Sequence, residues 1–167
     1  PAGAPGSEER FVIKTNEGLL FLGDAEQTER GSAMFLESAQ AQKALSDAGV
    51  PGWARILEIG RTDAGAYYVA DRYQRSVQKI VVRGIKVGAA GLRQVVTGIV
   101  DALVELRTRA SRPHGNLKTT NVLIGGPDGP TVDRDPIVLT DLKPASTLSP
   151  KDAEDDIRAI GRLVYEM

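Results

Sequence analysis

Polar residues between positions 114 and 121, together with Asp141, have the types needed for chemistry. His114 is the only histidine of the chain. Asn116 carries an amide, which has no basic lone pair near neutral pH, so it cannot accept a proton as a general base. The side-chain oxygens of Asn121 and Asp141 are the kind of ligand that Mg²⁺ prefers. The alternative interpretation is that Asn121 and Asp141 fix loops through hydrogen bonds.

Short strands and one long helix must position these residues. The helix is predicted over residues 91–110, because apolar side chains recur there at helical spacing. Strands are predicted over residues 10–14, 19–23, 32–37, 54–60, 66–73, 122–124 and 137–140, and further helices over 38–48 and from Ser149 onward. Residues 77–82 fit either a short helix or an extended connection.

The composition limits the class of protein. The chain has 167 residues, and its 41% apolar and 26% charged residues are ordinary for a globular domain. The net charge of −1 gives no electrostatic reason to expect nucleic acid or an anionic membrane as partner. The absence of cysteine excludes disulfides and fits a cytosolic setting. Residues 1–9, rich in Gly and Pro and then charged, are predicted to form a flexible linker.

The stretch from His114 to Asn121 reads H-G-N-L-K-T-T-N and resembles the catalytic loop of protein kinases, H-R-D-L-K-P-x-N. Asn116 stands in place of the reactive Asp. Asp141 matches the Asp of the D-F-G motif, and residues 156–167 follow the family's helix pattern D-V-W-S-L-G-V-I-L-Y-E-L. The chain is therefore similar to the protein-kinase-like superfamily in a degenerate form, and the style of the loop suggests a bacterial Ser/Thr-kinase relative.

This resemblance implies an α+β, bilobal protein-kinase-like fold. Residues 10–73 would form an N-lobe, with a small antiparallel five-stranded sheet and one short helix. Residues 74–167 would form a mainly helical C-lobe, incomplete after the helix at 151–167. The resemblance also assigns roles to single residues, structural ones to His114 and Asp156 and vestigial phosphate or metal binding to Lys118, Asn121 and Asp141.

The sequence departs from the family at residues that handle ATP. Phe35, in the strand predicted over 32–37, stands where the phosphate-binding Lys belongs. Leu142 and Lys143 replace the Phe and Gly of D-F-G. The helix predicted over 38–48 has no Glu to pair with that Lys, and Gln40 or Gln42 occupies its place. A single glycine lies between the first two strands, so the backbone there is a poor phosphate clamp.

The segment Val12-Ile13-Lys14 offers a second source for the missing lysine. It superficially matches the family's strand motif V-A-I-K, but it lies too early, with no room before it for a glycine loop. Lys14 either reaches phosphates from a neighbouring strand, as displaced lysines do in a few active relatives, or is a solvated strand lysine. We adopt the solvated interpretation as the expectation.

These departures predict a catalytically inactive pseudokinase domain, not an enzyme, that acts as a protein-interaction or allosteric regulatory module. The alternatives are a nucleotide-binding kinase-like domain and a small-molecule phosphotransferase of related fold. We expect no cofactor and no metal, with ATP and Mg²⁺ as the alternative. The expected partner is a protein, without nucleic acid or direct membrane contact. The expected location is cytoplasmic, which includes the cytosolic part of a membrane-anchored protein.

Overall fold

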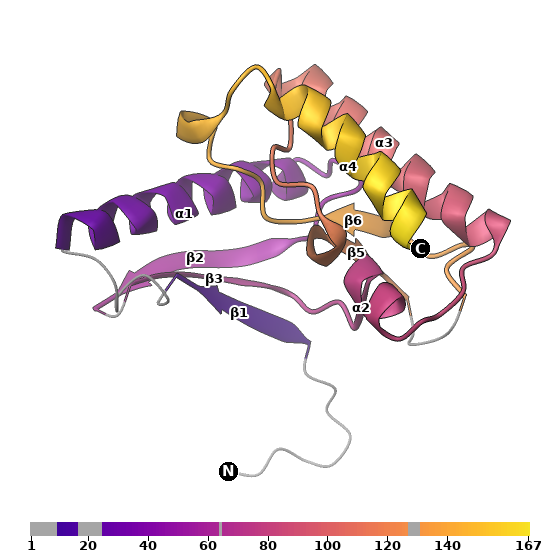
Figure 1. Cartoon of the computed structure of the whole chain (residues 1–167). Coiled ribbons are helices and arrows are strands. Elements are labelled where there is room, and N and C mark those ends of the chain that lie inside the picture. The colour runs from indigo at the N-terminus through magenta and orange to yellow at the C-terminus, as the bar shows by residue number, and fades with distance from the viewer. Residues whose placement is uncertain (1–9, 17–24, 64, 127–130) are drawn as a thin grey trace, which may run out of the picture.

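The computed structural model describes residues 10–16, 25–63, 65–126 and 131–167 (Figure 1). Within these ranges the chain is α+β, with four helices and two small antiparallel sheets of three strands each. One sheet packs against the first helix, and the other packs against the long third helix. Among the described residues, no helix combines the length and the apolar character needed to cross a bilayer.

The first sheet contains β1 (Phe11–Thr15), β3 (Gly65–Asp71) and β2 (Ile56–Thr62), in that spatial order. Buried residues alternate with half-buried ones along β3, the pattern of a strand with one face on a core. Its buried Tyr68 and Ala70 share a small core with β2 and with the first helix. β1 is an edge strand.

The helix α1 (Ala25–Asp47) covers one face of this sheet (Figure 1). Its sequence is rich in Ala, Glu and Gln, which are strong helix formers, and no Pro interrupts it. Its buried side chains recur at helical spacing: Ser32, Ala39, Gln42 and Leu45. The prediction of a strand over residues 32–37 is therefore wrong, because helix propensity and burial along the whole segment favour one long helix. The helix predicted over 38–48 is the second half of α1.

The predicted five-stranded sheet is not confirmed. The strands predicted over 10–14, 54–60 and 66–73 correspond to β1, β2 and β3. The segment 32–37 is helical, and the strand predicted over 19–23 lies outside the described residues. What the structure shows in this half of the chain is a three-stranded sheet under a long helix.

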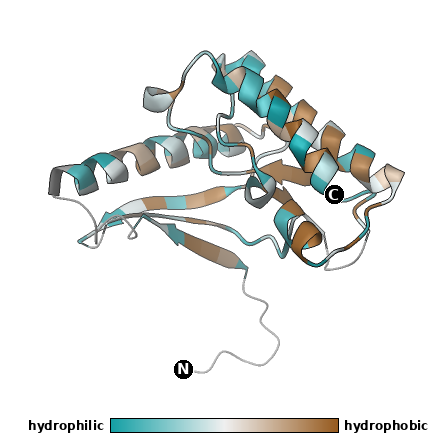
Figure 2. Ribbon diagram, in the orientation of Figure 1, coloured by the Kyte–Doolittle hydropathy of each residue, from teal (hydrophilic) through white to brown (hydrophobic). Residues whose placement is uncertain are grey.

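The second half of the chain is built around α3 (Ala89–Ala110), which forms where the apolar stripe predicted it. Its buried residues Val95, Ile99 and Leu106 belong to the main core. The second sheet has the order β4 (Arg75–Ser76), β5 (Val122–Ile124) and β6 (Ile137–Leu139). The brown colour of β5 and β6 in Figure 2 marks their apolar side chains. Residues 77–82, which fitted two structures, form the helix α2 (Val77–Val82).

The last helix, α4 (Asp152–Glu166), runs beside α3 (Figure 1). Its buried residues are Asp152, Asp156, Ala159 and Leu163. It starts later than the predicted Ser149, since Ser149 N–H donates a hydrogen bond of 2.6 Å to the Asp152 carboxylate and so lies outside the helix. A buried acidic residue in the middle of a helix needs hydrogen-bond donors from another element, and for Asp156 the 114–121 loop supplies them.

Candidate functional site

A cleft of about 490 Å³ lies between the first sheet with α1 and the loops that follow α3 and β6. Its lining side chains come from segments far apart in the sequence: Lys14, Thr15, Met34, Phe35, Ser38, Tyr68, Asn116, Asp141, Leu142 and Pro144. Phe35, Asn116, Asp141 and Leu142 are among the residues selected from the sequence, and the fold brings them to one place.

Asp141 is the centre of the polar contacts in this cleft. Its carboxylate accepts hydrogen bonds from Lys14 Nζ and from the Tyr68 hydroxyl, each at 2.6 Å. The Lys14 and Asp141 side chains are 35% and 31% exposed, so water screens this ion pair only in part. The φ of Asp141 is +60°, in the left-handed region that Asp tolerates better than most residues.

The backbone of Asp141 is held as well as its side chain. Its N–H donates a hydrogen bond of 2.8 Å to Oε1 of Gln42, which is buried in α1. Its carbonyl accepts a hydrogen bond of 2.9 Å from Nδ2 of Asn116. Gln42 also donates from Nε2 to the Ala54 carbonyl at 2.8 Å. Gln42, one of the residues expected in place of the family's Glu, thus binds backbone groups. Lys14 pairs with Asp141 and not with Gln42.

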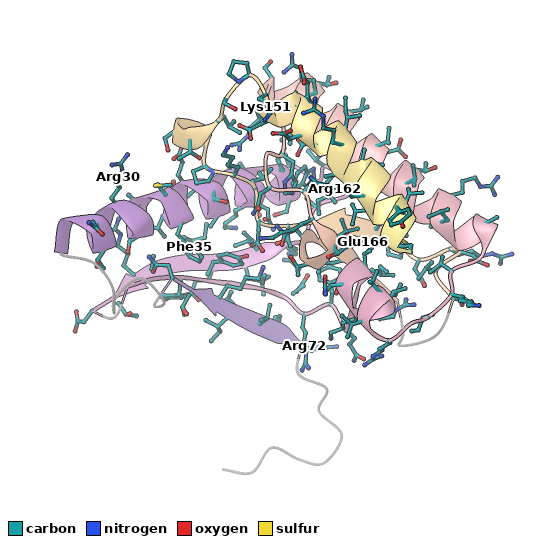
Figure 3. The ribbon with its side chains drawn as sticks, viewed as in Figure 1. Arg30, Phe35, Arg72, Lys151, Arg162 and Glu166 are labelled. Carbon is teal, nitrogen blue, oxygen red and sulfur yellow. The ribbon has the colours of Figure 1, made fainter. Side chains whose placement is uncertain are left out.

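Tyr68 supplies a neutral hydrogen-bond donor to the cleft. Burial, and then the negative charge of Asp141, raise the pKa of the Tyr68 phenol, so it stays protonated and can donate. Its ring stacks on Phe35 with 5.3 Å between the ring centroids. Figure 3 shows Phe35 reaching from α1 toward the sheet. Phe35 therefore lies on a helix, and its assignment to the strand position of the phosphate-binding Lys is wrong.

Among the described residues that line the cleft, Lys14 is the one with a cationic side chain. It alternates along β1 with Ile13, so its side chain points to the α1 face of the sheet, where Asp141 lies. Its Nζ also lies 5.7 Å from the centroid of the Tyr68 ring, within the range of a cation–π contact. The expectation that Lys14 is a solvated strand lysine is wrong. Because β1 lies beside β3, the Lys14 side chain faces the loop that contains Asp141.

His114 is fully buried beneath the cleft, stacked on Trp53 with 5.9 Å between the ring centroids. The Asn116 N–H donates to its Nδ1 at 3.2 Å, so Nε2 carries the proton and donates to the Thr140 carbonyl at 3.1 Å. Burial is the main cause that lowers the pKa of His114 to about 4. The ring is therefore neutral near pH 7, and it fixes the loop through hydrogen bonds on both nitrogens.

Asp156 of α4 holds the start of the same loop. Its carboxylate accepts hydrogen bonds from the backbone N–H groups of His114, at 2.8 Å, and Gly115, at 3.0 Å. Burial raises the pKa of this carboxyl group, while the backbone hydrogen bonds oppose that effect. Gly115 has a φ of +72°, a conformation that L side chains rarely adopt. These contacts give the loop a fixed position relative to α4.

Asn121 and Lys118 of the same loop are not among the residues that line the cleft. Asn121 is buried, and its Nδ2 donates a hydrogen bond of 2.9 Å to the Asn116 carbonyl. Lys118 is exposed and, with Arg162 and Glu166 of α4, lines a separate hollow of about 250 Å³. Lys118 and Asn121 are therefore not brought into the cleft with Asp141.

The residues after Asp141 join the cleft to the rest of the fold. Leu142 is buried, and its carbonyl accepts a hydrogen bond from the Ser38 hydroxyl of α1. Lys143 Nζ lies 2.8 Å from the carboxylate of Asp152 at the start of α4. The structure therefore places both residues in packing and ion-pair contacts that hold the segment after Asp141 in place.

The chemistry available in the cleft is limited. Among the described residues, its ionisable side chains are Lys14, Tyr68 and Asp141, and both Lys14 and Tyr68 donate a hydrogen bond to Asp141. Asn116 donates its amide N–H groups and has no proton-accepting nitrogen. Within the described residues, no group of three or more His, Cys, Asp or Glu side chains could hold a metal ion. A nucleotide phosphate or a cation would have to displace the Lys14–Asp141 pair or share it.

Sequence reasoning named Lys14 only as an alternative and missed Tyr68 as a member of the site. The similarity of Val12-Ile13-Lys14 to V-A-I-K was the available signal for Lys14. For Tyr68 the signal was weaker, since alternation with Ala66 and Ala70 places it on the buried face of a strand but gives its hydroxyl no partner. The partner is contributed by a loop that follows it by 73 residues.

A scan against models of known protein families and a search of curated proteins find no match to this chain.

Proposed function

We propose that this chain is a kinase-like domain that does not transfer phosphate and that acts by binding or regulating another protein. Four features support the kinase-like part of the proposal. A helix lies over a small sheet, and a strand lysine pairs with Asp141 across a cleft. A loop carrying His114 follows the long α3, and Asp156 of α4 binds the backbone of that loop. The bilobal arrangement of the protein-kinase family is part of this proposal.

The observation that carries the inactive part of the proposal is the set of contacts around Asp141. A phosphotransferase needs a base for the attacking hydroxyl and a carboxylate free to hold Mg²⁺. At the position of the base the chain has Asn116, whose amide donates to the Asp141 carbonyl. The Asp141 carboxylate is engaged on both oxygens, by Lys14 and Tyr68. Asn116 also counts against the small-molecule phosphotransferase, which needs the same base.

The direct test is transfer of labelled phosphate from ATP with Mg²⁺ to the chain itself and to generic protein and small-molecule acceptors. We expect no transfer by the natural chain. We also expect none after Asn116→Asp. In that variant Lys14 would still be paired with Asp141, and Leu142 and Lys143 would still follow Asp141. Turnover by either protein would contradict the proposal.

A second candidate function is nucleotide binding without turnover, and the position of Lys14 favours it. The Lys14 ammonium lies beside the Asp141 carboxylate in an open cleft. A phosphate could replace the carboxylate as the partner of Lys14, and Mg²⁺ could replace Lys14 as the partner of the carboxylate. A thermal shift with ATP and Mg²⁺ separates the candidates, because a ligand that binds only the folded state raises its stability. A Mg²⁺-dependent shift that Lys14→Met abolishes would select the second candidate. No shift at millimolar nucleotide would remove it.

A further inference from the structure

The strand β1 lies at the edge of its sheet, and its outer side pairs with no other described strand (Figure 1). On its inner side, the ladder with β3 continues to Asn16, whose N–H donates to the Ala66 carbonyl at 3.2 Å. Hydrogen-bonded positions alternate along an antiparallel pair, so the even-numbered residues of β1 bond to β3. The N–H and C=O groups of Phe11, Ile13 and Thr15 therefore point to the open edge.

The same strand exposes apolar side chains. Phe11 is 53% exposed and Ile13 is 65% exposed, and both lie on the face of the sheet opposite α1. On β3, half-buried Val69 lies directly opposite Ile13 and extends the apolar surface across the sheet. An edge with unpaired backbone groups and exposed apolar side chains is a template for strand pairing.

Nothing in the sequence of β1 blocks such pairing. Natural edge strands are commonly protected by Pro, by a bulge or by a charged side chain. Phe11–Thr15 contains no Pro and no Gly, and Phe, Val, Ile and Thr all have high strand propensity. The only charged residue, Lys14, points to the α1 face and is paired with Asp141. The open edge therefore carries no charge of its own.

We propose that a second copy of this chain adds to β1 through this edge, antiparallel and centred on Ile13. In that register Ile13 lies opposite Ile13 of the second copy and Phe11 lies opposite its Thr15, so every outward N–H and C=O group finds a partner. Lys14 lies opposite Val12 of the second copy, so like charges do not meet. The two sheets join into one, and an apolar row crosses the boundary from Val69 through Ile13 to the same residues of the second copy.

The sequence of β1 itself selects this partner. A two-fold axis through Ile13 presents the same strand to both copies, so each outward donor meets an outward acceptor without any other sequence. The central contact is Ile on Ile, and the flanking contact is Phe on Thr, which are favourable cross-strand pairs. Of β1, the cleft is lined by Lys14 on the α1 face and by Thr15 at the end of the strand, whereas the pairing is centred on Ile13, so it does not depend on whether the cleft binds a nucleotide.

The test is the molar mass of the purified chain in sedimentation equilibrium, over a dilution series that reaches about 100 µM, where a complex of micromolar Kd is almost fully assembled. The mass is expected to rise from 17.8 kDa toward twice that value. Ile13→Pro removes an outward N–H and leaves the bonds to β3 intact, since Pro is tolerated where the N–H faces solvent. Ile13→Lys instead places two like charges directly opposite each other. Each substitution is expected to raise Kd by about tenfold or more.

The matched control is Ile157→Lys, the same chemical change at a residue of α4 that is 70% exposed. It is expected to leave the dimer intact. Circular dichroism verifies that the variants are folded, and if Ile13→Pro is not, Ile13→Lys decides. A chain that stays monomeric over the whole series would overturn the proposal. So would a dimer that survives the Ile13 substitutions, or one that Ile157→Lys abolishes.

Discussion

Replacing Lys14 by Met removes the ammonium group that contacts Asp141 and keeps most of the apolar stem. The two charged groups are 2.6 Å apart, and their side chains are 35% and 31% exposed. Exposed ion pairs contribute at most about 1 kcal/mol to stability, whereas hydrogen bonds to charged groups contribute about 1.5–3 kcal/mol. For this partly exposed pair we expect the free energy of unfolding to fall by about 1–2 kcal/mol, between those limits. That loss lowers Tm by roughly 3–6 °C in a domain of this size.

A double-mutant cycle isolates the contribution of the pair. Asp141→Asn is the second substitution, since Asn removes the charge and tolerates the left-handed φ of +60°. The free energy of unfolding is measured by urea denaturation for the natural chain, both single variants and the double variant. We expect a coupling energy of about 1 kcal/mol or more, because Lys14→Met should cost little once the carboxylate is gone.

An exposed pair on α3 serves as the matched control. Arg109 Nε lies 2.7 Å from Glu105 Oε2, but their side chains are 54% and 36% exposed, and the pair joins adjacent turns of one helix. Its coupling energy is expected to be about 0.3–0.5 kcal/mol. If the Lys14–Asp141 coupling were no larger than this control, Lys14 would not be held in the cleft, and the reasoning about the site would be refuted.

Three further predictions concern buried hydrogen bonds and backbone. The pKa of His114 is lowered to about 4 by burial, so the unfolded state binds a proton that the folded state does not as pH falls below about 6.5. Stability should therefore drop by about 1.5 kcal/mol between pH 6.5 and 5 in urea denaturation, and a His114→Gln variant should lack this slope. Gln42→Leu leaves backbone groups of the cleft without partners and should cost about 2–4 kcal/mol, whereas Gln40→Leu, at an exposed position of the same helix, should cost almost nothing. Gly115→Ala should be worse than Gly84→Ala, in the same assay. Both have positive φ, which costs about 1 kcal/mol, but only at Gly115 would a Cβ come within 2.9 Å of neighbouring side chains. Equal costs for either matched pair, or a natural chain whose stability does not change with pH in this range, would contradict these assignments.

Local sequence patterns predicted the helices and strands whose buried side chains recur at a regular spacing within one segment. The apolar stripe of α3 lies within one helix, so its period identified the helix and its buried face. The alternation along β3 likewise predicted a strand. For residues 32–37 the same approach failed, because Phe35 and its apolar neighbours fit a short strand when the flanking helix formers are left out. Residue types selected the loop from His114 to Asn121 as a candidate site, but its position depends on distant partners, because Asp156 of α4 and the Thr140 carbonyl bind His114.

The contacts that define the cleft depend on the tertiary structure. Lys14 and Asp141 are separated by 127 residues, and Tyr68 and Asp141 by 73. Residue types and spacing indicate which groups are able to interact, and they predicted here that Asn116 cannot act as a base. They do not say which strand lies beside β3. The pairing of β1 with β3 is what places the Lys14 side chain next to Asp141 and not in solvent. The physical reason is that strand order and helix packing are decided by the burial of the whole core, while sequence patterns report only the preferences of each segment.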